Sequence, residues 1–329
     1  MSKDVFVYIE QRDAKLQKVS LELLGKGRLL AEQLGQEVVA VLVGHNVEPL
    51  CETLIEHGAD QVIVVDHPML QEYVTEPYAK AVTAAIRAND PEIVLYGATS
   101  IGRDLAPRIA ARIHTGLTAD CTALDIDPES KLLLMTRPAF GGNIMATILC
   151  EKHRPQMATV RPGVMLAMEP DSSRTGRVTR LSVPFTDEDM NVTIKGIFRE
   201  EKRQIDITEA KVLVSGGRGL NEAEGFQILG ELAEILEAEL SGSRAAVEAG
   251  WIEQDRQVGQ TGKTVRPDLY FAFGISGAIQ HIAGMEGSDY IIAVNKNNTA
   301  PIFETADLGI VGDLYDIVPR LVQALRHRR

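Results

Sequence analysis

Cysteine is scarce in this chain, which has only three among its 329 residues. Cys51, Cys121 and Cys150 lie far apart and form no CxxC pair, so the sequence predicts neither a disulfide framework nor a zinc site. The histidines show no HxxxH or HExxH spacing, and we therefore expect no other metal site. Widely spaced thiols of this kind are typical of a reducing compartment, which predicts a cytoplasmic protein.

Long hydrophobic runs and an excess of positive charge are also missing. No apolar run approaches the roughly 18 residues of a membrane span, so we expect no membrane insertion. The apolar run at residues 5–9 has Asp4 and Glu10 on either side, which is typical of a strand and not of a targeting peptide. A formal net charge of −12 argues against nucleic acid as a partner, because contacts with phosphates need a basic surface.

What remains is the composition of an ordinary globular protein, with 45% hydrophobic and 24% charged residues. A chain of 329 residues predicts two domains, each long enough to build its own core. An irregular stretch with several prolines ends in a run of charges at residues 199–203. We therefore place the domain boundary near residue 206, which gives domains of residues 1–205 and 206–329.

The first domain begins by alternating short apolar runs with amphipathic segments. We expect strands at residues 5–9, 38–43, 62–65 and 93–96, and helices at residues 47–56, 78–88 and after Ser100. A further helix lies between the first two strands, with Leu23, Leu30 and Leu34 on one face and Gly35 placed to end it. Nearly all-apolar strands separated by helices predict a parallel sheet that is covered on both faces.

After Gly116 the pattern changes, because strand-like runs follow one another without helices. These runs cover residues 132–136, 144–150 and 157–160. We expect them to pair antiparallel and to extend the first sheet. The turn-rich residues 137–143 between two of them predict a tight hairpin that faces a partner.

The alternation of strand and helix starts again at Lys211. We expect strands at residues 212–214, 269–273, 290–294 and 309–311, and a last helix at residues 315–325. A further helix is predicted from apolar residues that recur at three and four positions, namely Phe226, Leu229, Ala233, Leu236 and Leu240. The second domain is therefore predicted to be a smaller, doubly wound α/β unit.

Two glycine-rich turns of the second domain follow strand-like runs. In Ser215-Gly216-Gly217-Arg218-Gly219, glycine permits positive φ and lets the main chain face a phosphate, although a plain turn with a solvated arginine explains it equally well. In the segment from Gly274 to His281, the opening of a helix that we expect to continue to Gly284 predicts an anion site. This segment lacks the GxGxxG spacing of a nicotinamide-binding turn. Taken alone, His281 is more readily explained as a helix-surface or structurally satisfied histidine than as a cofactor ligand.

The segment Gly259-Gln260-Thr261-Gly262-Lys263-Thr264 looks like a phosphate-binding Walker A loop, but Gln257 stands where that motif needs glycine. ATP hydrolysis is therefore not supported, and the segment alone could be a simple polar loop. Arg244 follows Ser243 on what we expect to be a short strand, where an arginine taken alone is more readily explained as a surface ion-pair residue. Asn295 is expected to end a strand and Asp313 to open the last helix, which are also ordinary turn and cap positions.

In order and spacing, these segments together resemble the electron transfer flavoprotein α subunit. The similarity spans the chain and is most specific in VSGGRG, SRAAV, VGQTGK, GISGAIQH, NKNNTAPIF and ADLGIVGDL. It implies an α/β fold with an N-terminal nucleotide-hydrolase-like parallel sheet carrying an antiparallel extension, and a C-terminal doubly wound FAD-binding domain. The resemblance places FAD contacts at Arg218, Ser243, Arg244, Val258, Gly259, Gln260, Thr261, Ser276, Gly277, Ala278, Ile279, Gln280, His281, Asn295, Asp313 and Leu314.

The same resemblance implies roles for these groups. Gln260 and Thr261 would bond the flavin ring and its ribityl chain, and Asn295 and Asp313 would surround the adenosine half. Arg244 would tune the flavin, because a fixed guanidinium favours the reduced, negatively charged ring.

The resemblance further implies a redox carrier and not a stand-alone enzyme. The partner would be an electron transfer flavoprotein β subunit, which itself holds a second FAD or AMP, and electrons would pass to or from an acyl-CoA dehydrogenase. The segments TSIGRDLAPRIAARIHTGLTADCT and LMTRPAFGGNIMATI look like the version found in anaerobic bacteria. Some of those complexes bifurcate electrons from NADH, with ferredoxin or flavodoxin as a further partner.

Three other classes of protein remain open at this point. An NAD-dependent dehydrogenase on two α/β domains would need a GxGxxG turn with a following acidic residue. A sirtuin-like deacetylase would need zinc-binding cysteine pairs. A non-catalytic nucleotide-binding module built on the first domain would leave the motifs of residues 206–329 without a purpose.

Overall fold

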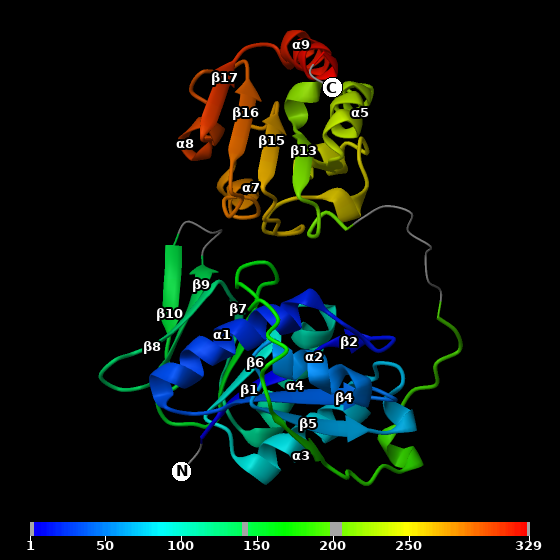
Figure 1. Cartoon of the computed structure of the whole chain (residues 1–329), viewed down its shortest axis with the longest axis vertical. Coiled ribbons are helices and arrows are strands. Elements are labelled where there is room, and N and C mark those ends of the chain that lie inside the picture. The colour runs from blue at the N-terminus through cyan, green and yellow to red at the C-terminus, as the bar shows by residue number, and fades with distance from the viewer. Residues whose placement is uncertain (1–2, 140–143, 198–205, 328–329) are drawn as a thin grey trace. The chain divides into compact units, whose positions relative to one another are not determined.

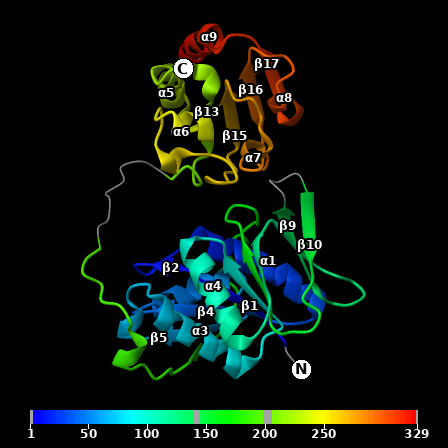
Figure 2. The same cartoon turned by 180° about the vertical axis from the view of Figure 1, so that it is seen from behind.

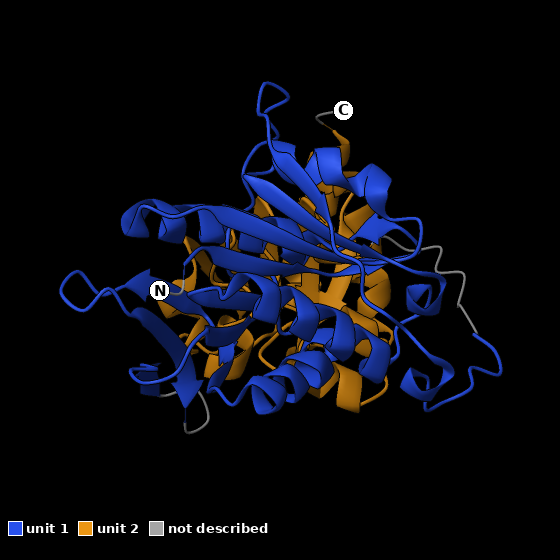
Figure 3. Ribbon diagram, turned by 90° about the horizontal axis from the view of Figure 1, so that it is seen from below, with its two compact units in different colours: residues 1–197 blue, residues 198–329 orange. Residues whose placement is uncertain are grey.

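The computed structural model describes residues 3–139, 144–197 and 206–327. The chain divides into two compact units, Met1–Ile197 and Phe198–Arg329 (Figure 3). Each unit has its own cores, formed on the two faces of a sheet. Within the described residues, no helix combines the length and the apolar character that crossing a membrane requires.

The first unit is built on a seven-stranded sheet whose neighbouring strands are all parallel (Figure 1). The order across the sheet is β12-β5-β4-β1-β6-β11-β7. Its strands are β1 Val5–Ile9, β4 Val38–Gly44, β5 Gln61–Asp66, β6 Ile93–Gly97, β7 Leu117–Cys121, β11 Gln156–Val160 and β12 Arg177–Arg180. Every residue of β1, β4, β6 and β11 is buried, as expected for strands that are covered on both faces.

Helices cover both faces of this sheet (Figure 2). The helices α1 Lys18–Leu34 and α2 Cys51–Glu56 pack in one core, and α3 Thr75–Asn89 and α4 Ser100–Ile113 pack in the other. As predicted, α1 ends at Gly35, which adopts a left-handed conformation with φ of 66°. The small strands β2 Gln11–Arg12 and β3 Lys15–Leu16 form a two-stranded sheet beside β1.

The predicted antiparallel extension of this sheet is wrong in two respects. The strands β8 Ala123–Ile126, β9 Leu133–Ala139 and β10 Ile144–Ile148 pair antiparallel with one another, but they form a separate sheet. The third predicted strand, now β11, lies parallel between β6 and β7 in the main sheet. An apolar run shows that a segment is a strand but does not select its partner, which depends on distant residues. The tip of the predicted hairpin, residues 140–143, lies outside the described residues.

The second unit is a five-stranded parallel sheet with the order β14-β13-β15-β16-β17 (Figure 1). Its strands are β13 Val212–Gly216, β14 Glu239–Gly242, β15 Leu269–Phe273, β16 Ile291–Asn295 and β17 Leu308–Val311. The helices α5 Gly225–Leu236 and α9 Leu314–Arg326 contribute to the core on one face. The short helices α7 Ile279–Ile282 and α8 Ile302–Thr305 contribute to the core on the other face. A doubly wound α/β unit was predicted, and the parallel sheet with helices on both faces confirms it.

Three local predictions in this unit are corrected. Helix α5 ends at Leu236 because Glu237 turns left-handed with φ of 52°, so Leu240 belongs to β14 and not to the helix. Arg244 is not on a strand, since it begins the helix α6 Arg244–Glu248 with Ser243 as its N-cap residue. The helix after Ala278 ends at Ile282 instead of reaching Gly284.

Candidate functional site

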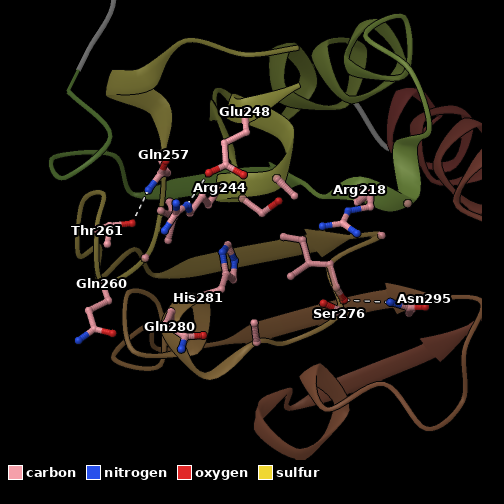
Figure 4. Close-up of a pocket in the computed structure, with 18 of the residues that line it drawn as sticks. Arg218, Arg244, Glu248, Gln257, Gln260, Thr261, Ser276, Gln280, His281 and Asn295 are labelled. Carbon is pink, nitrogen blue, oxygen red and sulfur yellow. Dashed lines mark hydrogen bonds and ion pairs between the residues drawn. The ribbon is translucent and has the colours of Figure 1, made fainter. Parts of the chain in front are cut away.

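The order in which strands are added to the second sheet reverses between β13 and β15. From β13 the chain crosses to β14 on one side and then returns to β15 on the other. Ligands of doubly wound proteins bind at the carboxyl ends of strands beside such a point. A cavity of about 670 Å³ lies there, bounded by the segments that follow β13, β14 and β15 and by the end of β16 (Figure 4). Its volume falls within the range that is usual for ligand and cofactor sites.

Twelve of the sixteen predicted site residues line this cavity. They are Arg218, Ser243, Arg244, Val258, Gly259, Gln260, Thr261, Ser276, Ala278, Gln280, His281 and Asn295. Sequence reasoning did not assign a role to three polar residues that also line it, namely Asn221, Glu248 and Gln257. Each of them stands within six residues of a predicted site residue. This proximity in the sequence is the signal that could have identified them.

Four predicted residues do not line the cavity. Gly277 and Ile279 lie in the same segment as residues that do. Asp313 is the N-cap residue of α9, where its carboxylate accepts a bond of 3.0 Å from the Tyr315 N–H, and it pairs with Lys296 at 2.9 Å. Leu314 is 4% exposed and packs in the core shared with α5. A contact from Leu314 to a cofactor would therefore have to come from its main chain.

The glycines after β13 and β15 are needed for close approach. A Cβ atom on Gly217 would lie 2.4 Å from the Gly274 carbonyl oxygen, and one on Gly219 would lie 2.7 Å from the Gly274 Cα. The expected positive φ is absent at Gly217, whose φ is −112°. Glycine is needed there because the two turns are in close contact. Positive φ is instead found on the other segments, at Gly259 with 140° and Gly277 with 86°.

The loop after β14 is held in place by bonds to neighbouring segments. The Val258 N–H donates to the Gly242 carbonyl at 2.9 Å, and the Gln260 N–H donates to the Gln280 carbonyl at 2.7 Å. Inside the loop, the Gln257 amide donates to the Thr261 hydroxyl at 3.0 Å (Figure 4). The polar side chains of this loop are therefore presented to the cavity by a main chain with defined geometry.

Asn295 connects the end of β16 to the segment after β15. Its side-chain amide donates to the Ile275 carbonyl at 2.9 Å, and its oxygen accepts from the Asn297 N–H at 2.9 Å. Ser276 is held at the same edge, because its carbonyl accepts from the Ile302 N–H at 3.2 Å. These contacts fix the wall of the cavity that contains Ser276 (Figure 4).

His281 is the buried titratable group of the cavity wall, with 6% of its surface exposed. Its Nε2 lies 3.0 Å from the Tyr270 hydroxyl, while its Nδ1 makes no hydrogen bond of good geometry with a described residue. Burial lowers the pKa of His281 to about 4, and the Val258 main chain opposes this only in part. The imidazole is therefore neutral at physiological pH.

Comparison with known proteins decides the family. Residues 5–186 match the electron transfer flavoprotein domain, and residues 206–286 match the electron transfer flavoprotein FAD-binding domain. The chain belongs to the electron transfer flavoprotein α-subunit family. The electron transfer flavoprotein subunit alpha of Thermoanaerobacterium thermosaccharolyticum is 55% identical, with 98% of both chains covered.

Other members of the family are nearly as similar. The protein FixB of Clostridium saccharobutylicum is 54% identical over 97% of this chain and 95% of its own length. The acryloyl-CoA reductase electron transfer subunit beta of Anaerotignum propionicum is 46% identical over 98% of this chain and 96% of its own length. Membership in the electron transfer flavoprotein family brings an electron-transfer role, a flavin cofactor and a β-subunit partner.

The residues of the cavity fit a flavin nucleotide. Closely packed glycine turns allow a ligand to approach the main chain, and the first turn of a helix leaves N–H groups without helical partners. Arg218 and Arg244 add positive charge, and the neutral ring of His281 forms part of the wall. A phosphate-bearing, polar ring system matches this set of groups.

Proposed function

We propose that this chain binds one FAD, without a covalent bond, in the cavity of its second unit and passes single electrons between redox partners. The observation that carries the proposal is that twelve residues expected to contact FAD line one cavity. Bound FAD would supply the redox chemistry, because a flavin accepts and returns electrons one at a time. The residues around it would bind it, orient it and adjust its preference for electrons.

The chain's own groups divide these tasks. Arg218, Ser276 and the neighbouring main-chain N–H groups provide charge and donors suited to phosphates. Gln260 and Thr261 stand on the hydrogen-bonded loop after β14, where they would orient the ring. Arg244 supplies the positive charge that favours a reduced, anionic ring.

Spectroscopy of the complex tests this function. The chain should be co-expressed with its β subunit, purified, and assayed for flavin absorbance and for the number of FAD molecules per heterodimer. We expect FAD to remain bound and Ser276→Ala to weaken its binding with little change in potential. A folded complex that stays colourless and takes up no added FAD would refute the proposal.

An acyl-CoA dehydrogenase is the proposed redox partner, in the cytoplasm. The support is that a relative with 46% identity is named as the electron transfer subunit of an acryloyl-CoA reductase. The complex should reduce, or be reduced by, an acyl-CoA dehydrogenase from the same cell, while the α chain alone should be inactive. Full activity from a rigorously monomeric α chain would contradict the role as an obligate subunit.

We further propose that the first unit is the base that contacts the β subunit. The antiparallel sheet ends in the edge strand β10, on which Ile144, Met145 and Ile148 are 54%, 53% and 39% exposed. An exposed edge that carries apolar side chains is unusual unless another chain covers it. Met145→Lys should weaken assembly with the β subunit, whereas Val311→Lys, at an apolar side chain 59% exposed in the second unit, should not.

The most specific proposal is that the assembled complex bifurcates electrons from NADH. It rests on the first-unit segments that resemble those of anaerobic bacteria, and it requires a second FAD on the β subunit. The assay combines NADH, crotonyl-CoA, an acyl-CoA dehydrogenase and ferredoxin without oxygen. Reduction of ferredoxin that depends on crotonyl-CoA supports bifurcation. If ferredoxin stays oxidised and the β subunit carries AMP, the complex is a carrier with one flavin.

A further inference from the structure

A cluster of buried hydroxyl groups lies beneath His281. Ser215 is on β13, Ser241 is on β14 and Tyr270 is on β15, and each of the three is completely buried. Ser215 is paired directly with Ser241 across the two strands. Tyr270 stands two residues before Ala272, the partner of Ser215, so all three side chains are on the same face of the sheet.

The hydrogen-bonding capacity of this cluster indicates where its protons lie. The Ser215 and Ser241 oxygens are buried and have no well-formed hydrogen bond, and the phenol oxygen of Tyr270 is the polar group next to both. Each serine O–H needs an acceptor, because a buried hydroxyl without a partner is costly. If the phenol oxygen accepts from the serines, its own O–H is left to donate to His281 Nε2, 3.0 Å away.

That donation has a consequence for the imidazole. A neutral histidine carries one proton, so a ring that accepts at Nε2 must carry its proton on Nδ1. Nδ1 is buried and faces the main chain of Val258, a residue that lines the same cavity as His281. The Nδ1–H is therefore directed at the main chain of Val258 in the cavity wall.

We propose that Tyr270, backed by Ser215 and Ser241, is a positioning residue that keeps the proton of His281 on Nδ1, directed at Val258, and so holds this part of the cavity wall in place for the ligand. The proposal rests on the function above only in naming that ligand as FAD. The burial of the ring keeps it neutral, and the Tyr270 hydroxyl selects between the two neutral forms.

The first test reads the tautomer directly in the full-length chain, with no FAD added. Nitrogen-15 NMR of labelled histidine distinguishes a protonated from an unprotonated ring nitrogen, and the His281 signal is assigned by its loss in His281→Gln. We expect a protonated Nδ1 and an unprotonated Nε2. A proton on Nε2 in the unmodified chain would overturn the proposal.

The second test removes the hydroxyl group and keeps the ring. Tyr270→Phe should give His281 a mixture of tautomers and should raise the dissociation constant for FAD by about five-fold, the effect expected from the loss of about one hydrogen bond. The matched control is Tyr290→Phe, because Tyr290 is 45% exposed and does not line the cavity. An unchanged tautomer in folded Tyr270→Phe would also refute the proposal.

The serine pair gives an independent variant. Ser215→Ala with Ser241→Ala should leave the phenol free to accept from the imidazole, and so shift part of the His281 proton to Nε2. Titration of the unmodified chain with FAD separates a failure of the proposed function from a failure of the role proposed for Tyr270. Failure to bind FAD contradicts the proposed function, whereas the tautomer is measured without the cofactor.

Discussion

Arg244 and Glu248 form an ion pair one turn apart on α6, with 2.7 Å between Nε and Oε1 (Figure 4). Both side chains line the cavity and both are more than half exposed. An exposed pair at this spacing contributes only about 0.3–0.5 kcal/mol. The guanidinium is therefore easily released to a ligand, and the carboxylate stays beside it as an opposing charge.

Removing the charge of Arg244 and removing the charge of Glu248 should shift the flavin potential in opposite directions. We expect Arg244→Ala to lower it, because the charge that favours the anionic ring is lost, and Glu248→Gln to raise it. Each shift should correspond to roughly 1–2 kcal/mol, or about a five- to thirty-fold change in the preference for reduced FAD. Redox titration of the complex measures both. Glu234→Gln, on the exposed side of α5, is the control that should leave the potential unchanged.

Gly277 should not tolerate a side chain. Its φ is 86°, and a Cβ atom there would lie 2.2 Å from the Ile302 main-chain nitrogen. We expect Gly277→Ala to lower the free energy of unfolding by more than about 2 kcal/mol and to weaken FAD binding. Gly230 on α5 is the matched control, because nothing lies within 4 Å of the position that a Cβ atom would occupy there. Gly230→Ala should stabilise the chain by about 0.5–1 kcal/mol in urea unfolding.

The lowered pKa of His281 predicts how the free energy of unfolding depends on pH. Its pKa falls from 6.5 to about 4 in the folded chain, so between these values the unfolded chain binds more protons. The free energy of unfolding should therefore rise as pH increases from about 4 to 6.5 and should gain nothing from this residue above that range. The contribution is at most about 3 kcal/mol. Urea unfolding at several pH values should show a smaller slope in His281→Gln, and an equal slope would contradict the assignment.

Substitution of Asp313 tests whether this residue only caps α9 or also contacts the cofactor. Because it caps α9, Asp313→Ala should lower stability by about 1 kcal/mol. If Asp313 also stands near the adenosine half of FAD, as expected from the sequence, the dissociation constant for FAD should rise by about two- to five-fold. Lys296→Ala is the control that breaks the ion pair and keeps the cap. If Asp313→Ala leaves the affinity for FAD unchanged, Asp313 serves only as the N-cap residue of α9.

The sequence by itself determined the elements and the segments of the site. Apolar runs located β1, β4 and β6, and Gly35 marked the end of α1, because strand burial and helix capping depend on near neighbours in the chain. The order and spacing of polar loops led to the family and to residues that line one cavity.

Tertiary structure decided what depends on distant partners. It placed β11 inside the main sheet and set β8, β9 and β10 apart, because strand pairing is selected by the whole fold and not by the local pattern. It also placed Tyr270 of β15 against His281 of α7. Parallel strands bring their carboxyl ends to one edge of a sheet, and only that arrangement turns separate loops into a single site.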